Sequence, residues 1–407
     1  MKKIFLILGM HRSATSLTAG ILYSYGMYAG EEEDLLEADK DNQHGFFENK
    51  KVFLLNEMIW CEHGSYSGQC ADKINLISNT KYTNEIKYIL NDLIQNSEEK
   101  QDIFIKDPRI CMVEPVWRKE IKKCGIEENI IVVFRHPYEV AKSLQKRNNI
   151  NFIYGLKLWF YYNLSILYCI ADSDIPVLIL KHEDYFNKKT IQMNKLEKFI
   201  DYDDINKEAV NFIDISLRHN YMENIKGTNN SELENMVYNL YKYLIYISDN
   251  NCNVSKIDLK QYDMYLKKIA ATSYDAEEKD MSYMYYKDVN GIEKKMWCLY
   301  QLYDKKNILV SKFKNYFNEY NVKDIYIYGN GTITEGLVPV LNRAGISIKK
   351  IIDKSKNGYI EDLQNAEAQT YILNTVVNYG NSVLKDLLKY FKAEFILDIY
   401  ILLKEII

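Results

Sequence analysis

Short runs of apolar, often β-branched residues alternate with longer amphipathic segments over the first half of the chain. Compact apolar runs of this kind are typical of strands that are buried on both faces of a parallel sheet. Four of them predict strands, at Ile4–Leu8, Ile103–Lys106, Ile130–Phe134 and Val177–Leu180. Helices are predicted between them, over Thr15–Tyr25, over Pro137–Arg147 and along the aromatic stretch after Asn151. Strands that alternate with helices indicate a three-layer α/β fold with a parallel sheet for residues 1–222.

The pattern changes twice further along the chain. Between residues 223 and 320, Tyr, Lys, Asn and Glu dominate, proline is absent, and Leu233–Ile247 and Trp297–Tyr320 carry apolar residues at helical spacing. This stretch is predicted to be a helical connector. From 321 to 407 a second α/β pattern follows, with strands expected at Ile325–Tyr328, Ile348–Ile352, near Tyr371 and near Phe395, and helices expected up to Leu341 and over Ser382–Phe391.

Composition limits the classes of function. The chain has 407 residues, of which 47% are apolar and 27% charged, and this balance is ordinary for a protein with a packed core. Its formal net charge of −4 gives no reason to expect nucleic acid as a partner, so local basic clusters must carry any anion binding. Seven irregularly spaced cysteines favour reduced thiols in a cytoplasmic protein over a disulfide framework.

Two features could suggest a membrane span or a metal site, and we expect neither. Phe152–Ala171 is long enough to raise the question of a transmembrane helix, but its lysine and polar residues favour a buried helix instead. Cys61, His63 and Cys70 could be imagined around zinc, but they lack a recognisable fourth ligand.

A loop rich in hydroxyl residues connects the first predicted strand directly to the first predicted helix. In that context backbone N–H groups and the helix dipole can converge on an anion, and Arg12 adds a charged fork suited to oxyanions. The candidate binding residues are Gly9, His11, Arg12, Ser13, Ala14, Thr15 and Ser16. An ordinary strand–turn–helix junction, capped by Ser13 or Thr15, is the alternative.

The same loop argues against a kinase or an NTP-hydrolysing enzyme. Such a protein would need Gly-x-x-x-x-Gly-Lys-Ser/Thr here. Counting from Gly9, the last three positions hold Ala14, Thr15 and Ser16, so the lysine that would reach the β- and γ-phosphates is missing. A nucleotide kinase or NTPase therefore stays only as an alternative function.

A second motif follows the third predicted strand. Ile130–Phe134 ends at Arg135, and Pro137 occupies a first helical position. Ser143 follows eight residues after the arginine, and Arg147 lies one turn further on. A strand-end arginine and a serine on the next helix can share one phosphate, so these three polar residues form a second candidate anion site.

Together the two motifs resemble the bacterial branch of the sulfotransferase family that depends on 3′-phosphoadenosine-5′-phosphosulfate (PAPS). The resemblance implies that the first loop binds the 5′-phosphosulfate, that Arg135 and Ser143 bind the 3′-phosphate, and that 3′-phosphoadenosine-5′-phosphate (PAP) is a product. It covers about the first 220 residues and extends to four further elements: Gly45-Phe46-Phe47-Glu48, Lys106-Asp107-Pro108-Arg109, Leu158-Trp159 and Leu217-Arg218-His219. One departure is Ala14, where the family has glycine. If the loop needs a left-handed backbone there, alanine costs about 1–2 kcal/mol.

The resemblance also implies roles in catalysis. Arg12 is expected to stabilise the oxygen that leaves with the nucleotide. Glu48 is the first candidate for the general base, followed by His44 and then His11. Lys106 and Asp107 are expected either to orient the base or the acceptor or to form a structural ion pair at the strand end. The alternative for Glu48 is a surface carboxylate that begins the helix through Trp60. No metal is expected in this scheme.

The C-terminal region carries a weaker motif. Gly329-x-Gly331 after a strand, with Asp353 after the next strand, is similar to a dinucleotide fingerprint, but Thr334 stands where the third glycine belongs. It resembles the small Rossmann-like modules appended to some polysaccharide-modifying enzymes, and nucleotide binding and a structural role both remain open.

The partners follow from the resemblance. A hydroxyl-bearing acceptor is expected, in the first place a carbohydrate of a cell-surface polysaccharide or glycan, with a lipid or a small alcohol as alternatives. A catalytically inactive nucleotide-binding scaffold also stays open, as does a homo-oligomer.

Overall fold

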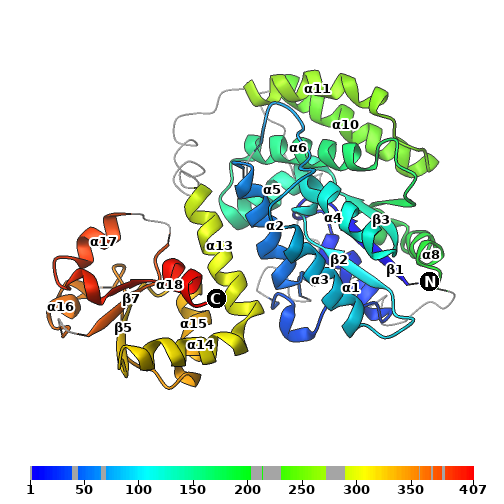
Figure 1. The fold of residues 1–407 in the computed structure, drawn as a ribbon. Helices are drawn as coiled ribbons and strands as arrows, with labels where there is room; N and C mark the ends of the chain where they lie inside the picture. Colours follow the sequence, from blue (N-terminus) through cyan, green and yellow to red (C-terminus); the bar gives the residue numbers. More distant parts are fainter. Residues whose placement is uncertain are drawn as a thin grey trace. The chain divides into compact units, whose positions relative to one another are not determined.

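A computed structural model describes residues 2–38, 45–65, 70–202, 213, 231–271, 289–356, 358–367, 370–377 and 381–407. The chain forms two compact units, one of Met1–Trp60 and Ser67–Ser282, the other of Cys61–Tyr66 and Tyr283–Ile407. Each unit contains a four-stranded sheet in which all paired strands are parallel. Figure 1 shows both sheets with their helices. All seven cysteines are free thiols, as the sequence predicts.

The sheet of the first unit has the order β2-β1-β3-β4. Its strands are β1 (Lys3–Leu8), β2 (Ile103–Lys106), β3 (Glu127–Phe134) and β4 (Val177–Lys181), which confirms all four predicted strands. Because the strands are parallel and in register, with Ile7 beside Lys106 and Leu8 beside Val132, their carboxyl ends lie at one edge of the sheet. The loops that follow β1, β2 and β3 therefore meet there.

Helices cover both faces of this sheet. Phe5 and Ile7 of β1 belong to a buried cluster that also includes residues of α1 (Thr15–Ser24) and α8 (Lys189–Ile200). The alternate residues Ile4, Leu6 and Leu8 point to the other face and are also buried, and α4 (Ile110–Cys124) packs against β3. Each fully buried Ile, Leu or Phe side chain contributes about 1.5–3 kcal/mol to folding. The three-layer α/β fold predicted for this region is confirmed.

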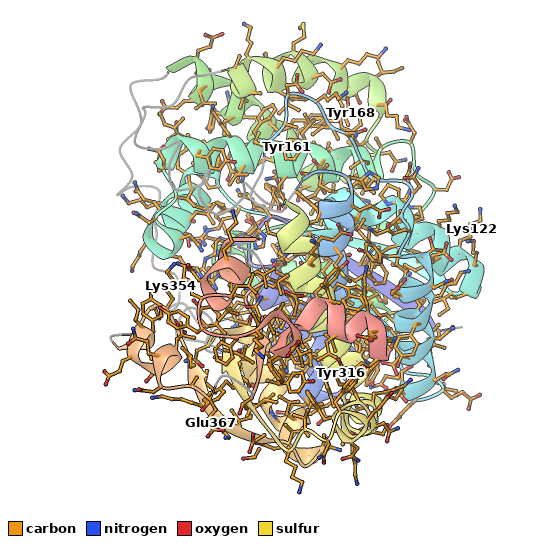
Figure 2. The ribbon with its side chains drawn as sticks, turned by 60° about the vertical axis from the view of Figure 1, so that its left-hand side comes forward. Lys122, Tyr161, Tyr168, Tyr316, Lys354 and Glu367 are labelled. Atoms are coloured by element: carbon orange, nitrogen blue, oxygen red, sulfur yellow. The ribbon has the colours of Figure 1, made fainter. Side chains whose placement is uncertain are left out.

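Helix α6 (Phe152–Ile170) is the buried helix expected from the sequence. It packs against α4, α5 (Pro137–Asn148), α10 (Ser231–Asn250) and α11 (Lys256–Ala271), as Figure 1 shows for α10 and α11. Figure 2 labels Tyr168 on this helix, whose hydroxyl donates to the Asp263 carboxylate of α11 at 2.8 Å. Among the described residues, no helix combines the length and the apolar character needed to cross a membrane.

The second unit has the strand order β6-β5-β7-β8. The strands are β5 (Asp324–Tyr328), β6 (Ser347–Ile352), β7 (Tyr371–Asn374) and β8 (Ile396–Asp398), close to their predicted places. Helix α15 (Thr332–Arg343) follows β5 and packs against α13 (Val289–Asp304) and α14 (Lys306–Glu319). Residues of α16 (Tyr359–Gln364) and α17 (Asn381–Leu387) pack with the sheet, and α18 (Ile399–Ile406) ends the chain.

The segment 223–320, expected as a helical connector, is divided between the units. Helices α10 and α11 belong to the first unit, where α10 packs against β4 and α6. Helices α13 and α14 belong to the second unit. Apolar residues at helical spacing predict a helix with one buried face, but they do not say which neighbour covers that face.

Candidate active site

The loop between β1 and α1 contains two residues with a strained backbone conformation. Arg12 and Ala14 have φ angles of 69° and 73°, in the left-handed region. The strain anticipated at Ala14 is therefore present. Gly9 is required for a different reason, since an added Cβ would lie 2.5 Å from Thr15 Cγ2 and 2.6 Å from the Val133 carbonyl oxygen of β3. The loop is thus held tightly against the end of the neighbouring strand.

The Ser13 side chain suits an anion at this loop. It is fully buried, and its hydroxyl has no hydrogen-bond partner among the described residues. A buried polar group left unsatisfied costs about 1–3 kcal/mol. This hydroxyl can donate a hydrogen bond to an oxyanion. The N–H groups at the start of α1 and the partly buried Ser16 are further donors at the same place.

The loop and the second motif meet directly. Arg12 Nε donates to Ser143 Oγ at 2.8 Å across 131 positions of sequence, and Arg135 Nη1 donates to the Arg12 carbonyl oxygen at 3.3 Å. Arg135 Nε donates to Glu139 Oε2 at 2.9 Å, and Trp159 Nε1 donates to the Arg135 carbonyl oxygen at 2.9 Å. The two candidate anion sites thus form one continuous basic region.

Arg147, the third residue of the second motif, lies further out. It is exposed near the end of α5, and its guanidinium carbon lies 5.7 Å from the centre of the Phe46 ring. It therefore belongs to the rim of the basic region.

Lys106, at the end of β2, connects the loop with the best base candidate. Its ammonium donates to Glu48 Oε1 at 2.5 Å, to Ser16 Oγ at 3.1 Å and to the Phe46 carbonyl oxygen at 3.2 Å. Glu48 is only 6% exposed. The helix that follows, α2 (Lys50–Glu62), is capped by Asn49, whose Oδ1 accepts from Lys51 N. The alternative of a surface carboxylate that begins this helix is therefore wrong.

A buried network lies behind Glu48, and two of its members, Arg109 and Glu57, were given no role from the sequence, although Arg109 stands in the motif Lys106-Asp107-Pro108-Arg109. Arg109 Nη1 bonds Asp107 Oδ1 at 2.7 Å and lies 3.9 Å from Glu48 Oε2, while its Nε bonds Glu57 Oε1 at 2.6 Å. Burial opposes the charge on Arg109, but the carboxylates of Asp107, Glu57 and Glu48 outweigh it and raise its pKa well above the usual value. Arg109 thus stays charged and fixes the surroundings of Glu48.

The pKa of His11 reflects its burial and the positive charges around it. Its burial, followed by the charges of Arg109, Lys106, Arg147 and Arg12, lowers its pKa well below the usual range. The imidazole is therefore neutral at pH 7 and a weak proton acceptor. Two other sequence candidates, His44 and the Leu217-Arg218-His219 segment, lie outside the described residues.

The Gly329 loop of the second unit has the same place in its sheet. Gly329 has a φ of +105°, and an added Cβ would lie 2.7 Å from both Thr375 Oγ1 and Val376 Cγ2. Thr334, at the third fingerprint position, is buried and bonds the Gly329 carbonyl oxygen at 2.8 Å. Hydrogen bonds from the Ser355 side chain and backbone, with a smaller one from the Asn330 N–H, lower the pKa of Asp353. The Asp353 carboxylate thus already accepts a hydrogen bond from one backbone N–H of this loop.

Comparison with known proteins gives two structural neighbours. The sulfotransferase domain from the Synechococcus PCC 7002 olefin synthase matches with 16% identity and a TM-score of 0.40, over 60% of this chain and 96% of that domain. The sulfotransferase domain from the curacin biosynthetic pathway matches with 13% identity and a TM-score of 0.33, over 70% of this chain and 99% of that domain. Both are sulfotransferase domains, the family that the sequence motifs resemble. No protein-family model and no curated protein matches the chain.

Proposed function

We propose that this protein is a sulfotransferase that moves a sulfuryl group from PAPS to a hydroxyl acceptor. The observation that carries the proposal is the direct contact between the two motifs, in which Arg12 Nε bonds Ser143 Oγ while Arg135 bonds the Arg12 backbone. PAPS carries a 5′-phosphosulfate and a 3′-phosphate on one ribose, so its two anionic groups need two basic sites that adjoin each other.

The donor set fits these two groups. The buried Ser13 hydroxyl, the N–H groups at the start of α1 and Ser16 suit the 5′-phosphosulfate. The guanidinium groups of Arg12 and Arg135, with the Ser143 hydroxyl that Arg12 Nε contacts, suit the 3′-phosphate. Charge-assisted hydrogen bonds of this kind are about twice as strong as neutral ones.

For two residues we propose roles that differ from those expected from the sequence. Arg12 was expected at the oxygen that leaves with the nucleotide, but its Nε is directed to Ser143. The Lys106 ammonium, by contrast, lies at Ser16 on the first turn of α1 and at Glu48. We therefore assign stabilisation of the leaving oxygen to Lys106, and contact with the 3′-phosphate to Arg12.

The proposed step is a single in-line displacement. The acceptor oxygen forms a bond to sulfur while the bond between sulfur and the oxygen of the 5′-phosphate breaks, and the electron pair of that bond leaves with PAP. Glu48 takes the acceptor proton, and a positioned base of this type contributes about 10²–10⁴-fold. Like phosphoryl transfer, the step depends mainly on position and charge stabilisation.

The acceptor class is proposed by analogy. A carbohydrate hydroxyl of a cell-surface polysaccharide is our first choice, because the second unit resembles modules appended to polysaccharide-modifying enzymes. Lipids and small alcohols are the competing acceptors to be tested beside it.

The test combines binding with transfer. Calorimetry with PAP should give saturable binding, and PAPS labelled with ³⁵S should transfer label to at least one member of a panel of glycans, lipids and small alcohols. Hydrolysis of ATP without PAP binding would favour a nucleotide kinase or NTPase. PAP binding without transfer to any acceptor class would favour the inactive scaffold.

A further inference from the structure

A second group of ionisable side chains lies next to Arg135, on the side of its partner Glu139. Glu139 belongs to α5, while His182 and Glu183 follow β4 and precede the short helix α7 (Asp184–Asn187). The three side chains are buried, with 1%, 5% and 9% of their surface exposed. One potential ligand atom of each lies within 4.8 Å of those of the other two. Residues far apart in sequence thus place an imidazole and two carboxylates around one point.

The hydrogen bonds around this group leave one acceptor without a donor. Glu183 Oε1 accepts from His136 N at 3.1 Å, but Glu183 Oε2 has no partner among the described residues although the side chain is more than nine-tenths buried. Buried polar atoms are almost always satisfied by a donor or an ion. His136 does not supply a further ligand, because its Nδ1 accepts from Tyr138 N and its Nε2 then carries the hydrogen.

We propose that Glu139, His182 and Glu183 form a binding site for one divalent first-row cation, with Zn²⁺ or Mn²⁺ as the expected ions. An imidazole suits Zn²⁺ and carboxylates suit both ions. Ligand atoms bound to one ion at about 2.0–2.2 Å lie at most roughly 4.4 Å apart, so small side-chain movements complete the site. The two carboxylates balance the charge of the ion, and because a carboxylate has two oxygens, Glu139 can bond Arg135 and the ion together.

The position of the site gives it a consequence for donor binding, and this part rests on the proposed function. A cation held by Glu139 competes with Arg135 for the carboxylate charge and adds positive potential beside it. The Arg135 guanidinium is then more available to a phosphate. The cation and PAP should therefore each raise the affinity of the other by the same factor.

The site is tested with Co²⁺ as a spectroscopic probe for the full-length, metal-free protein. Wild type should show visible absorption bands that saturate at one equivalent and disappear when Zn²⁺ displaces the probe. His182→Gln and Glu183→Gln should each weaken Co²⁺ binding by at least about tenfold. Glu128→Gln is the matched control, because it removes a carboxylate from the separate buried pair that Glu128 forms with Glu114, and it should bind as wild type does.

Two outcomes overturn the site: no saturable Co²⁺ binding to wild type, or equal affinity in wild type and both site variants. Glu183→Gln keeps an oxygen for the His136 N–H, which favours a folded variant. If a variant does not fold, the Tm of wild type provides the test. A folded state that binds the ion is stabilised by it, so this Tm must rise with Zn²⁺ or Mn²⁺ concentration. A Tm that stays constant rejects the site.

The coupling has its own measurement. The Kd for PAP, determined with and without Zn²⁺, should decrease with the ion in wild type but not in His182→Gln. Unchanged PAP affinity in a protein that binds the ion rejects the coupling, and absence of PAP binding at any ion concentration contradicts the proposed function instead.

Discussion

The two glycine loops of this protein share an architecture and differ in their chemistry. Each follows an inner strand of a four-stranded parallel sheet, β1 in the first unit and β5 in the second, and each leads into a helix. Each also begins with a glycine that a larger residue could not replace without a clash, Gly9 against Val133 and Gly329 against Thr375. The backbone alone would suggest the same ligand for both.

The side chains around the loops separate them. Burial and, after it, four cations lower the pKa of His11 in the first loop, and the buried Ser13 hydroxyl has no partner in the described structure. In the second loop, hydrogen bonds from Ser355 and, to a smaller extent, from the Asn330 N–H lower the pKa of Asp353, and Thr334 bonds the Gly329 carbonyl oxygen. The comparison teaches that a strand–loop–helix geometry offers anion binding only where its donors are unsatisfied and the surrounding charge is positive.

The largest expected effect is a loss of turnover that follows a substitution beside the first loop but not one beside the second. Glu48→Gln should lower the turnover of sulfuryl transfer by about 10³-fold, because the acceptor proton loses its base, while the Kd for PAP changes less than about twofold. Transfer of ³⁵S from PAPS and calorimetry with PAP measure the two quantities. Asp353→Asn, at the corresponding edge of the other sheet, is the control and should leave turnover unchanged. Near-normal turnover in Glu48→Gln would remove Glu48 from the role of base.

Nucleotide affinity gives the next contrast. Arg12→Ala should weaken PAP binding by about 10–100-fold, since a hydrogen bond to a charged group contributes about 1.5–3 kcal/mol. Asp353→Asn should leave the affinity as it is, if PAP binds only to the first loop. Calorimetry on the three proteins is sufficient. Equal weakening by the two substitutions would mean that the nucleotide does not distinguish the loops.

Opposite changes in local stability should follow from the glycine positions. Gly329→Ala should destabilise the second unit by about 1–3 kcal/mol, because the new side chain meets Thr375 and Val376 at a positive φ. Ala14→Gly should stabilise the first unit by up to about 1 kcal/mol, because it relieves a left-handed alanine. Hydrogen exchange of β5 and β1 peptides reports on the units separately. A loss of protection in β1 on Ala14→Gly would contradict the assigned strain.

The smallest expected effect is a pH dependence of the first unit. Unfolded His11 takes up a proton near pH 6.5, whereas folded His11 resists protonation, so the free energy of unfolding decreases as pH falls below about 6.5. One such proton contributes at most about 1.4 kcal/mol per pH unit. Hydrogen exchange of β1 at pH 7 and pH 5 should show a smaller loss of protection in His11→Gln than in wild type.

The exposed His63 is the control for that measurement, and His63→Gln should retain the full acid sensitivity. If wild type and His11→Gln lose protection equally, the acid sensitivity comes from other groups.

The sequence was sufficient for the strands and for the meeting of the two motifs at one sheet edge. Parallel strands place their following loops together, so Arg12 and Arg135 had to converge if both assignments were right. The strain at Ala14 was also foreseeable, because the family pattern has glycine there. The strand and loop patterns are local in sequence, and the parallel pairing of the strands then brings the two distant loops to one edge of the sheet.

The contact between Arg109 and Glu57 was not foreseeable in the same way. Arg109 and Glu57 are 52 residues apart, and their contact depends on how α2 packs beside the end of β2. The same reason explains why Glu48 could be read as a surface residue. Two observations exclude a surface position for Glu48: its side chain is buried, and the residue that caps the following helix is Asn49.

Lys106 has a consequence that follows from counting protons. An ammonium group has three N–H bonds, and those of Lys106 already serve Ser16, the Phe46 backbone and Glu48. No newly arriving oxygen can take one of them unless an existing partner lets go. If that partner is Glu48, binding of PAPS in the loop frees the Glu48 carboxylate to accept the proton of the hydroxyl acceptor. PAPS would then have to bind before the acceptor can react, because the Lys106 ammonium has only three hydrogens to donate.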